Sequence, residues 1–313
     1  MTETTKEIFD KHEIRKTKEQ RKAFRDYVIT YAKTQGYEAK EENAGKKVAN
    51  VVVGNPDSAD VIYTAHYDTC ATMPFPNFIT PKCFSIYLLY QLLVTTIMFI
   101  IPIMIMFVLA PIVLKETNSQ ALYTATLMGG YLLLWIILYV MMNGPANKHT
   151  ANDNTSGVTL LIDLMTEMPD ELRHKVAYIF FDLEERGTVG SKCYKQKHKQ
   201  IAASKPVINF DCVSDGKNIL FAVKKQASKL APKLSEAFKS NDTYTVDVAT
   251  KGVFYPSDQR NFAQGVGVSA LNKTKHGLLY MNKIHTKRDT VYDEENIEFL
   301  KNGAIELARI INE

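Results

Sequence analysis

Residues 177–191 read AYIFFDLEERGTVGS, an apolar run followed by two glutamates and a turn that contains glycines. The apolar run is short, aromatic and β-branched, which predicts a strand in the centre of a sheet. Glu184 and Glu185 follow the end of that strand, where the ligands of open α/β sheets gather. Two adjacent carboxylates point in different directions, so one can bind a metal while the other moves a proton. An isolated pair of glutamates lies more often in a solvated loop than in a metal site. The rest of the sequence is needed to decide between these two interpretations.

The size and composition of the chain allow one or two globular domains and argue against nucleic acid as a partner. Its 313 residues are enough for one large domain or two smaller ones. The 38 basic and 34 acidic residues give a net charge of +4, and the basic residues form no stripe interleaved with aromatics. The four cysteines form no C-x-x-C pair, which is typical of free thiols in a reducing compartment.

Short apolar segments alternate with segments of helical spacing along most of the chain. Strands are predicted at residues 37–42, 47–53, 60–66, 175–182, 206–211, 218–223, 244–248, 265–271 and 278–282, with a turn around residues 43–45 between the first two. Helices are predicted at residues 5–34, 158–168, 191–201, 228–239 and 294–311. This alternation predicts the α/β class, with a mostly parallel central sheet and helices on both faces.

Two long uncharged runs interrupt this pattern. Residues 84–114 and 121–147 contain no charged side chain, and Lys115 and Glu116 are the only charges between Lys82 and Lys148. A run of about 18 or more apolar residues is long enough to cross a bilayer as a helix. We therefore predict an inserted transmembrane helical hairpin at residues 84–143, which divides the rest of the chain, a single discontinuous domain, into residues 1–83 and 144–313. The alternatives are a buried soluble hairpin and a hydrophobic dimerisation arm, but two such runs exceed what a domain of this size usually buries.

Histidines and acids lie at the ends of several predicted strands or in the loops just past them. They are His66 with Asp68, Asp153, Glu184 with Glu185, Asp211, and His285. Each of them alone is a weak signal, because a lone strand-end histidine is more often a hydrogen-bonded surface residue. An Asp in an Asn-rich loop such as residues 143–157 is more often an Asx turn or a helix N-cap. Together, imidazoles and carboxylates from separate strand ends suit zinc, cobalt or manganese.

The same residues fall in stretches that resemble a known family. The stretches are AHYDT at 65–69, NDNTSG at 152–157, FDLEERGTVGS at 181–191, INFD at 208–211, SDQRNF at 257–262 and IHTKRDT at 284–290. In order and spacing they resemble the co-catalytic di-zinc aminopeptidases of the MH clan of metallopeptidases, such as the bacterial secreted aminopeptidases. The resemblance covers most of the chain outside the hairpin. It implies a zinc-exopeptidase fold and two Zn²⁺ ions, with Co²⁺ or Mn²⁺ as alternatives.

The resemblance also implies a role for each residue. Five would bind metal: His66, Asp153 as the bridge between both ions, Glu185, Asp211 and His285. Glu184 would be the general base, and Asp68 would orient the imidazole of His66. The chain departs from the family at Gln259, where a His or Tyr is frequent, and this leaves substrate preference open. Tyr255 nearby is expected either to donate to an oxyanion or to pack.

These observations predict a membrane-anchored two-zinc metallopeptidase, an aminopeptidase that hydrolyses N-terminal peptide bonds. One alternative is another amide hydrolase of the same fold, such as a carboxypeptidase or a deacylase. A chemistry like that of glutaminyl cyclases is disfavoured, because those relatives use one metal and this chain keeps ligands for two. A non-catalytic membrane scaffold on a peptidase fold is also disfavoured, because all five ligands and Glu184 are present. The preferred substrate residue and the oligomeric state are left open.

The hairpin and the polar N-terminus together predict a topology. Residues 1–20 lack the apolar segment of a secretory signal. Two crossings return the chain to the side it left, as they must if His66 and Asp153 share one site. We expect a two-pass membrane protein with a cytoplasmic catalytic domain and residues 115–120 on the other side, although Lys82 and Lys148 against Lys115 give only a small positive-inside bias. The expected partners are a peptide substrate and the lipid bilayer, through residues 84–143.

Overall fold

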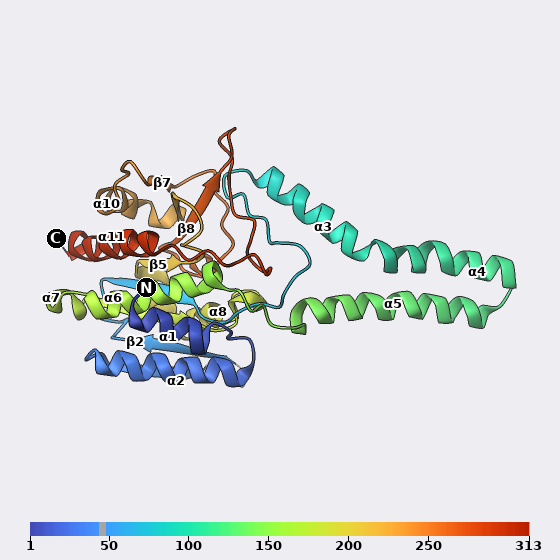
Figure 1. Ribbon diagram of the computed structural model, residues 1–313, viewed down its shortest axis with the longest axis horizontal. Coiled ribbons are helices and arrows are strands. Elements are labelled where there is room, and N and C mark those ends of the chain that lie inside the picture. Colours follow the sequence, from blue (N-terminus) through green and yellow to red (C-terminus); the bar gives the residue numbers. More distant parts are fainter. Residues whose placement is uncertain (44–47, 313) are drawn as a thin grey trace.

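A nine-stranded sheet forms the centre of the structure, a computed structural model that describes residues 1–43 and 48–312. Helices cover both faces of this sheet, and a long helical hairpin projects from one end of the body (Figure 1). The predicted α/β class is therefore confirmed. Residues 44–47, which include part of the predicted turn and the predicted start of the second strand, lie outside the described residues.

The strands are ordered β1-β2-β4-β3-β5-β8-β6-β7, and β9 pairs with β8. Their bounds are β1 Ala39–Asn43, β2 Ala49–Val53, β3 Val61–His66, β4 Val176–Phe181, β5 Val207–Phe210, β6 Asn218–Val223, β7 Thr245–Ala249, β8 Gly265–Lys273 and β9 Leu279–Tyr280. The central strands β4, β3, β5 and β8 are parallel. The direction reverses on both sides of them, because β2 is antiparallel to β4 and β6 is antiparallel to β8.

Helices from distant parts of the chain cover the sheet. One face packs against α1 (Glu3–His12), α2 (Lys18–Thr34), α6 (Ser156–Glu167), α7 (Asp170–Arg173), α10 (Ala231–Ala237) and α11 (Glu294–Asn312). The opposite face packs against α8 (Val189–Lys197) and α9 (Lys199–Ser204). In β4, Tyr178 and Phe180 point to the first face, and Ile179 and Phe181 point to the second. Because both faces are covered, the strand is apolar at every position.

Two predicted helices are each divided in the structure. The segment 5–34 forms α1 and α2, which are separated by residues 13–17. Arg15 in that break is fully buried, and its guanidinium donates to the main-chain oxygen of Tyr67 and to Thr155 Oγ1. Thr17 then caps α2 in a capping box with Gln20. The segment leaves the helical conformation where Arg15 is buried among partners that are distant in sequence. The periodicity of residues 5–34 could not reveal those partners.

The predicted basic helix at 191–201 is likewise divided into α8 and α9 at His198. The backbone of His198 is not helical, its ring stacks on Tyr194, and its Nε2 lies 2.8 Å from Glu42 Oε1. A contact with β1 therefore interrupts this helix. The region predicted as a helix at 228–239 is a 3-10 segment, Lys225–Leu230, followed by α10.

The hairpin consists of α3 (Phe84–Met104), a π-helical turn (Ile105–Leu109), α4 (Ala110–Thr117) and the returning helix α5 (Gln120–Asn143). The π-helical turn lies between Pro102 and Pro111, which lack the N–H that a regular helix needs. Gly130 of α5 packs against the turn, where an added Cβ would lie 2.6 Å from Met106 Cγ. By length and composition, the segments 84–117 and 120–143 could each cross a membrane, and only 17% and 6% of their most apolar windows are buried in the protein.

Candidate metal centre

The parallel strands bring the predicted site residues to one edge of the sheet. His66 is the last residue of β3 and lies in register with Phe181 at the end of β4. Glu184 and Glu185 follow β4 in a short 3-10 turn, Glu184–Arg186, and Asp211 directly follows β5. Because β4, β3 and β5 are neighbours and run in the same direction, the residues just beyond their carboxyl ends meet.

Asp153 reaches the same edge from the loop before α6. That loop is held by Asp289, whose carboxylate accepts the main-chain N–H of Asn152 at 2.9 Å and of Asp153 at 3.0 Å. Asn154 anchors it to β5, because its side chain donates to Phe210 O and accepts from Gly157 N. An added Cβ at Gly157 would lie 2.4 Å from Phe210 O, so only glycine allows α6 to begin so close to the strand.

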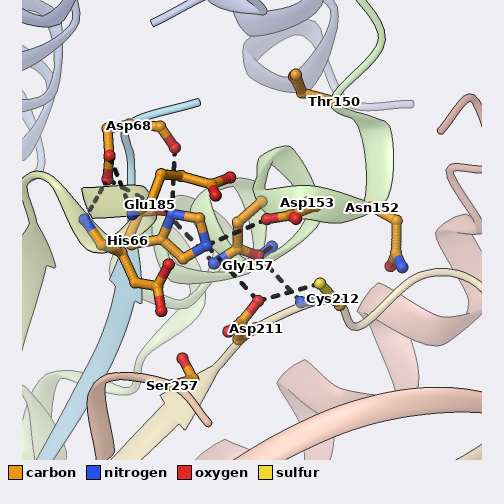
Figure 2. A network of polar contacts seen from close by, with 12 residues as sticks. His66, Asp68, Thr150, Asn152, Asp153, Gly157, Glu185, Asp211, Cys212 and Ser257 are labelled. Atoms are coloured by element: carbon orange, nitrogen blue, oxygen red, sulfur yellow. Dashed lines mark hydrogen bonds and ion pairs between the residues drawn. The ribbon is translucent and has the colours of Figure 1, made fainter. Parts of the chain in front are cut away.

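His66 forms one half of the centre. Its Nε2 lies 3.2 Å from Asp153 Oδ1 and 3.6 Å from Asp211 Oδ1. Figure 2 shows its imidazole between Asp68 and the pair formed by Asp153 and Asp211. One ligand atom each from His66, Asp153 and Asp211 lies within 4.8 Å of the other two, and all three side chains are buried.

His285 forms the other half. Its Nε2 lies 3.1 Å from Asp153 Oδ2 and 3.2 Å from Glu185 Oε2. The two oxygens of Asp153 therefore face two different imidazoles, one in each half. A single carboxylate shared in this way is the arrangement that a bridge between two metal ions requires.

Asp68 makes contacts that the sequence alone did not predict. Its carboxylate accepts the main-chain N–H of Glu184 at 2.8 Å and of Glu185 at 3.3 Å. The Nδ1 atom of His66 lies 3.1 Å from the main-chain oxygen of Asp68 and 3.6 Å from its carboxylate. Asp68 thus positions the loop of both glutamates with its side chain, and its main-chain oxygen lies closer to His66 Nδ1 than its carboxylate does.

The two adjacent glutamates differ in their surroundings. Both line a cavity of about 220 Å³ together with His66, Asp153 and Asp211. Glu185 contacts His285, whereas Glu184 is not among the described residues whose ligand atoms cluster around either histidine. Tyr255 also lines this cavity, but its hydroxyl donates to the main-chain oxygen of Asp211 at 2.8 Å. Of the two expectations for Tyr255, the structure therefore favours a structural role.

The electrostatics of the cluster favour bound cations. Burial alone would lower the pKa of the His66 imidazole, but the carboxylates around it raise that pKa well above its ordinary value. The same balance of burial against carboxylates raises the pKa of His285. Burial also raises the pKa of Glu184 and of Glu185. A buried site with more carboxylates than imidazoles is stabilised by positive charge.

The donor atoms present fit zinc. Imidazole nitrogen and carboxylate oxygen are zinc ligands, and each half offers three of them. Oε1 of Glu185 is buried and has no hydrogen-bond partner among the residues that the structure describes. A buried carboxylate oxygen of this kind is accounted for if it binds a cation.

Three further polar residues support the site and were given no role from the sequence. Asp289 and Asn154 hold the Asp153 loop, as described above. Asp258 is buried, accepts a hydrogen bond from Ser191, and has its pKa raised to about 7 chiefly by burial. Asp258 and Asp289 lie within stretches that resemble the family, so that resemblance was the available signal for them.

The sequence model of peptidase family M28 matches residues 139–308, which is more than half of the chain. The chain belongs to peptidase family M28. As an M28 peptidase, the protein is a zinc-dependent hydrolase, and the predicted family is confirmed. The matched segment includes Asp153, both glutamates, Asp211 and His285, while His66 and Asp68 precede the hairpin and join them only in the fold.

Solved structures with the same fold include an aminopeptidase, a glutaminyl cyclase and a Zn-dependent exopeptidase from bacteria. The aminopeptidase LapA of Legionella pneumophila has a TM-score of 0.56 and 13% identity, over 97% of this chain and 69% of that one. A glutaminyl cyclase of Porphyromonas gingivalis has a TM-score of 0.58 and 15% identity, over 98% of this chain and 95% of that one. A Zn-dependent exopeptidase of Parabacteroides distasonis has a TM-score of 0.56 and 14% identity, over 97% of both chains. No match was found among curated proteins.

Proposed function

We propose that this M28 peptidase is a membrane-anchored aminopeptidase that uses two zinc ions. The observation that carries the proposal is the position of Asp153, whose two carboxylate oxygens face His66 and His285 separately. One ion would be held by His66, Asp211 and Asp153, and the other by His285, Glu185 and Asp153. When bound, such ions polarise the scissile carbonyl and activate water.

Glu184 is the proposed general base. Both glutamates line the cavity beside the ligand sets, but Glu185 is engaged with His285 and Glu184 belongs to neither cluster of ligand atoms among the described residues. Glu184 would take a proton from the attacking water and deliver it to the leaving amine. Asp68 is a positioning residue in this proposal, because its carboxylate holds the main chain of both glutamates.

A substrate panel tests the proposed activity. The full chain, purified in detergent and loaded with Zn²⁺, is expected to hydrolyse aminoacyl amides and short peptides with a free N-terminus. Acetylation of that N-terminus should abolish cleavage. If blocked peptides lose a C-terminal residue or an acyl group instead, the enzyme is a carboxypeptidase or a deacylase. Formation of pyroglutamate from an N-terminal glutamine, without cleavage, would assign it to cyclase chemistry.

The proposed anchor is the hairpin 84–143, which divides the catalytic domain into 1–83 and 144–313. Its helices expose apolar side chains along their whole length, including Phe107 and Trp135. Basic side chains lie at the base of the hairpin, where it joins the catalytic domain. Lys16 donates to the main-chain oxygen of Met142 at 3.0 Å, and Arg186 donates to Asn143 at 3.0 Å. These two add to Lys82 and Lys148 on the domain side, and the resulting excess supports a cytoplasmic catalytic domain.

The end of α5 also lies beside the proposed active site. Met141 and Met142 line a cavity of about 230 Å³ that reaches Glu185 and His285. The end of α5, where the chain would leave the bilayer, therefore lines the same cavity as two of the proposed metal ligands. This proximity supports substrates that are held at, or released from, the membrane surface.

Cysteine labelling tests the topology. Thr117 and Ser58 are both exposed, the first at the tip of the hairpin and the second on the catalytic domain. In intact cells, an impermeant thiol reagent is expected to label Thr117→Cys and to leave the matched variant Ser58→Cys unlabelled until the cells are permeabilised. The opposite pattern would overturn the orientation. Equal labelling of both variants before permeabilisation would contradict a two-pass hairpin.

A further inference from the structure

A thiol lies beside the His285 half of the proposed metal centre. Cys70 is in the loop that follows β3, four residues after His66, and it is 7% exposed. Its Sγ, a carboxylate oxygen of Glu185 and a ring nitrogen of His285 all lie within 4.8 Å of one another. We propose that Cys70 is an additional, thiolate ligand of the ion held by His285 and Glu185. This inference rests on the proposed two-metal function, to which it adds a ligand that neither the sequence motifs nor the family resemblance predicted.

The distances are close to those of a zinc site. Tetrahedral zinc with bonds of about 2.0–2.3 Å places its ligand atoms roughly 3.3–3.8 Å apart. His285 Nε2 already lies 3.2 Å from Glu185 Oε2 and 3.1 Å from Asp153 Oδ2. The thiol lies within 4.8 Å of ligand atoms of Glu185 and His285, so a shift of no more than about 1.5 Å would bring it to ligand separation from these two. Asp153 would be the fourth member of the set.

The loop that carries Cys70 is fixed on both sides. Asn147 donates its main-chain N–H to Cys70 O at 3.1 Å, which ties the loop to the segment that follows α5. Met73 donates its main-chain N–H to the main-chain oxygen of His285 at 2.8 Å, which ties it to the loop of the metal ligand itself. The main chain therefore keeps the thiol within 4.8 Å of a ring nitrogen of His285. The buried Oε1 of Glu185 has no hydrogen-bond partner among the described residues.

A second buried cysteine provides a contrast within the same site. Cys212 follows Asp211, and its Sγ donates to Asp211 Oδ1 at 3.1 Å. Its thiol therefore contacts a ligand carboxylate and approaches the His66 half as a hydrogen-bond donor. The Cys70 thiol lies near two proposed ligands of one metal ion, whereas the Cys212 thiol donates a hydrogen bond to a ligand carboxylate. Cys212 is therefore a matched control for substitutions of Cys70.

A thiolate ligand would make the two halves of the centre chemically different. The His66 half offers one imidazole and two carboxylates, whereas the His285 half gains a soft sulfur. Soft thiolates select zinc and similar ions over manganese and magnesium. We therefore expect the His285 position to retain zinc under conditions in which the His66 position exchanges it.

Cobalt substitution tests the inference on the full chain. The Co²⁺-loaded protein is expected to show a thiolate-to-cobalt charge-transfer band in the near ultraviolet, which Cys70→Ser removes and the control Cys212→Ser retains. Zinc competition with a chelator should show at least about tenfold weaker binding at one of the two positions in Cys70→Ser, because even supporting residues of metal sites cost 10–100-fold.

The outcomes separate this inference from the proposed function. A wild-type protein that binds two Co²⁺ ions and shows no such band has no thiolate ligand, and the two-metal proposal then stands without Cys70. A band that disappears in Cys212→Ser and persists in Cys70→Ser would also overturn the inference. Failure of the wild-type protein to bind two ions would instead contradict the proposed function. Because the wild-type spectrum alone decides the first outcome, misfolding of a variant does not remove the test.

Discussion

Replacing Glu184 with glutamine should leave metal binding intact and lower turnover by about 10²–10⁴-fold, the usual cost of losing a general base. The amide keeps the size of the side chain but cannot accept the proton of the attacking water. Glu184 lines the cavity and is not among the residues whose ligand atoms cluster around His66 or His285, so the loss should appear in kcat and not in metal content. The measurements are metal analysis and steady-state kinetics on an aminoacyl amide.

Glu185→Gln is the matched control for this experiment. Its carboxylate lies 3.2 Å from His285 Nε2, so the same chemical change one residue later should weaken metal binding as well as turnover. A Glu184→Gln enzyme with a near-normal rate, or one that loses metal while Glu185→Gln retains it, would show that the two roles are exchanged.

Removal of the Asp153 carboxylate should disturb both metal positions at once. The side chain contacts His66 through Oδ1 and His285 through Oδ2, whereas Asp211 contacts only His66 of these two. We therefore expect Asp153→Ala to lose most of both ions on dialysis, and Asp211→Ala to retain about one ion per chain. Metal content after dialysis against a graded chelator series measures this difference.

A control substitution separates this effect from a general loss of fold. Asp163 is a half-buried acid on α6, outside the site, and Asp163→Asn should leave both metal positions filled. One tightly held ion per wild-type chain at saturating metal, with full activity, would contradict the two-metal proposal. Equal ion loss in Asp153→Ala and Asp211→Ala would show that Asp153 does not connect the two positions.

Much of the fold could be predicted because its determinants are local. The β4 run is apolar at every position since both of its faces are buried, and the glutamates follow at its carboxyl end. The hairpin could be predicted from two long runs without charge, which no ordinary surface segment has. Helix ends were predicted less well, because the breaks at Arg15 and His198 depend on partners just after β3, just before α6 and in β1.

The sequence by itself determined the fold class, the family and the position of the hairpin, because strand ends, apolar runs and motif residues can be read along the chain. Only the tertiary structure decided which side chains meet. In the fold, His66 contacts Asp153 although the hairpin separates them in sequence, and the two oxygens of Asp153 face two different imidazoles. The Asp68 carboxylate accepts a hydrogen bond from the main chain of Glu184. The fold also brings Cys70 within reach of His285. These contacts link residues as far apart as 215 positions along the chain, and their geometry depends on strand order and register, which local patterns do not encode.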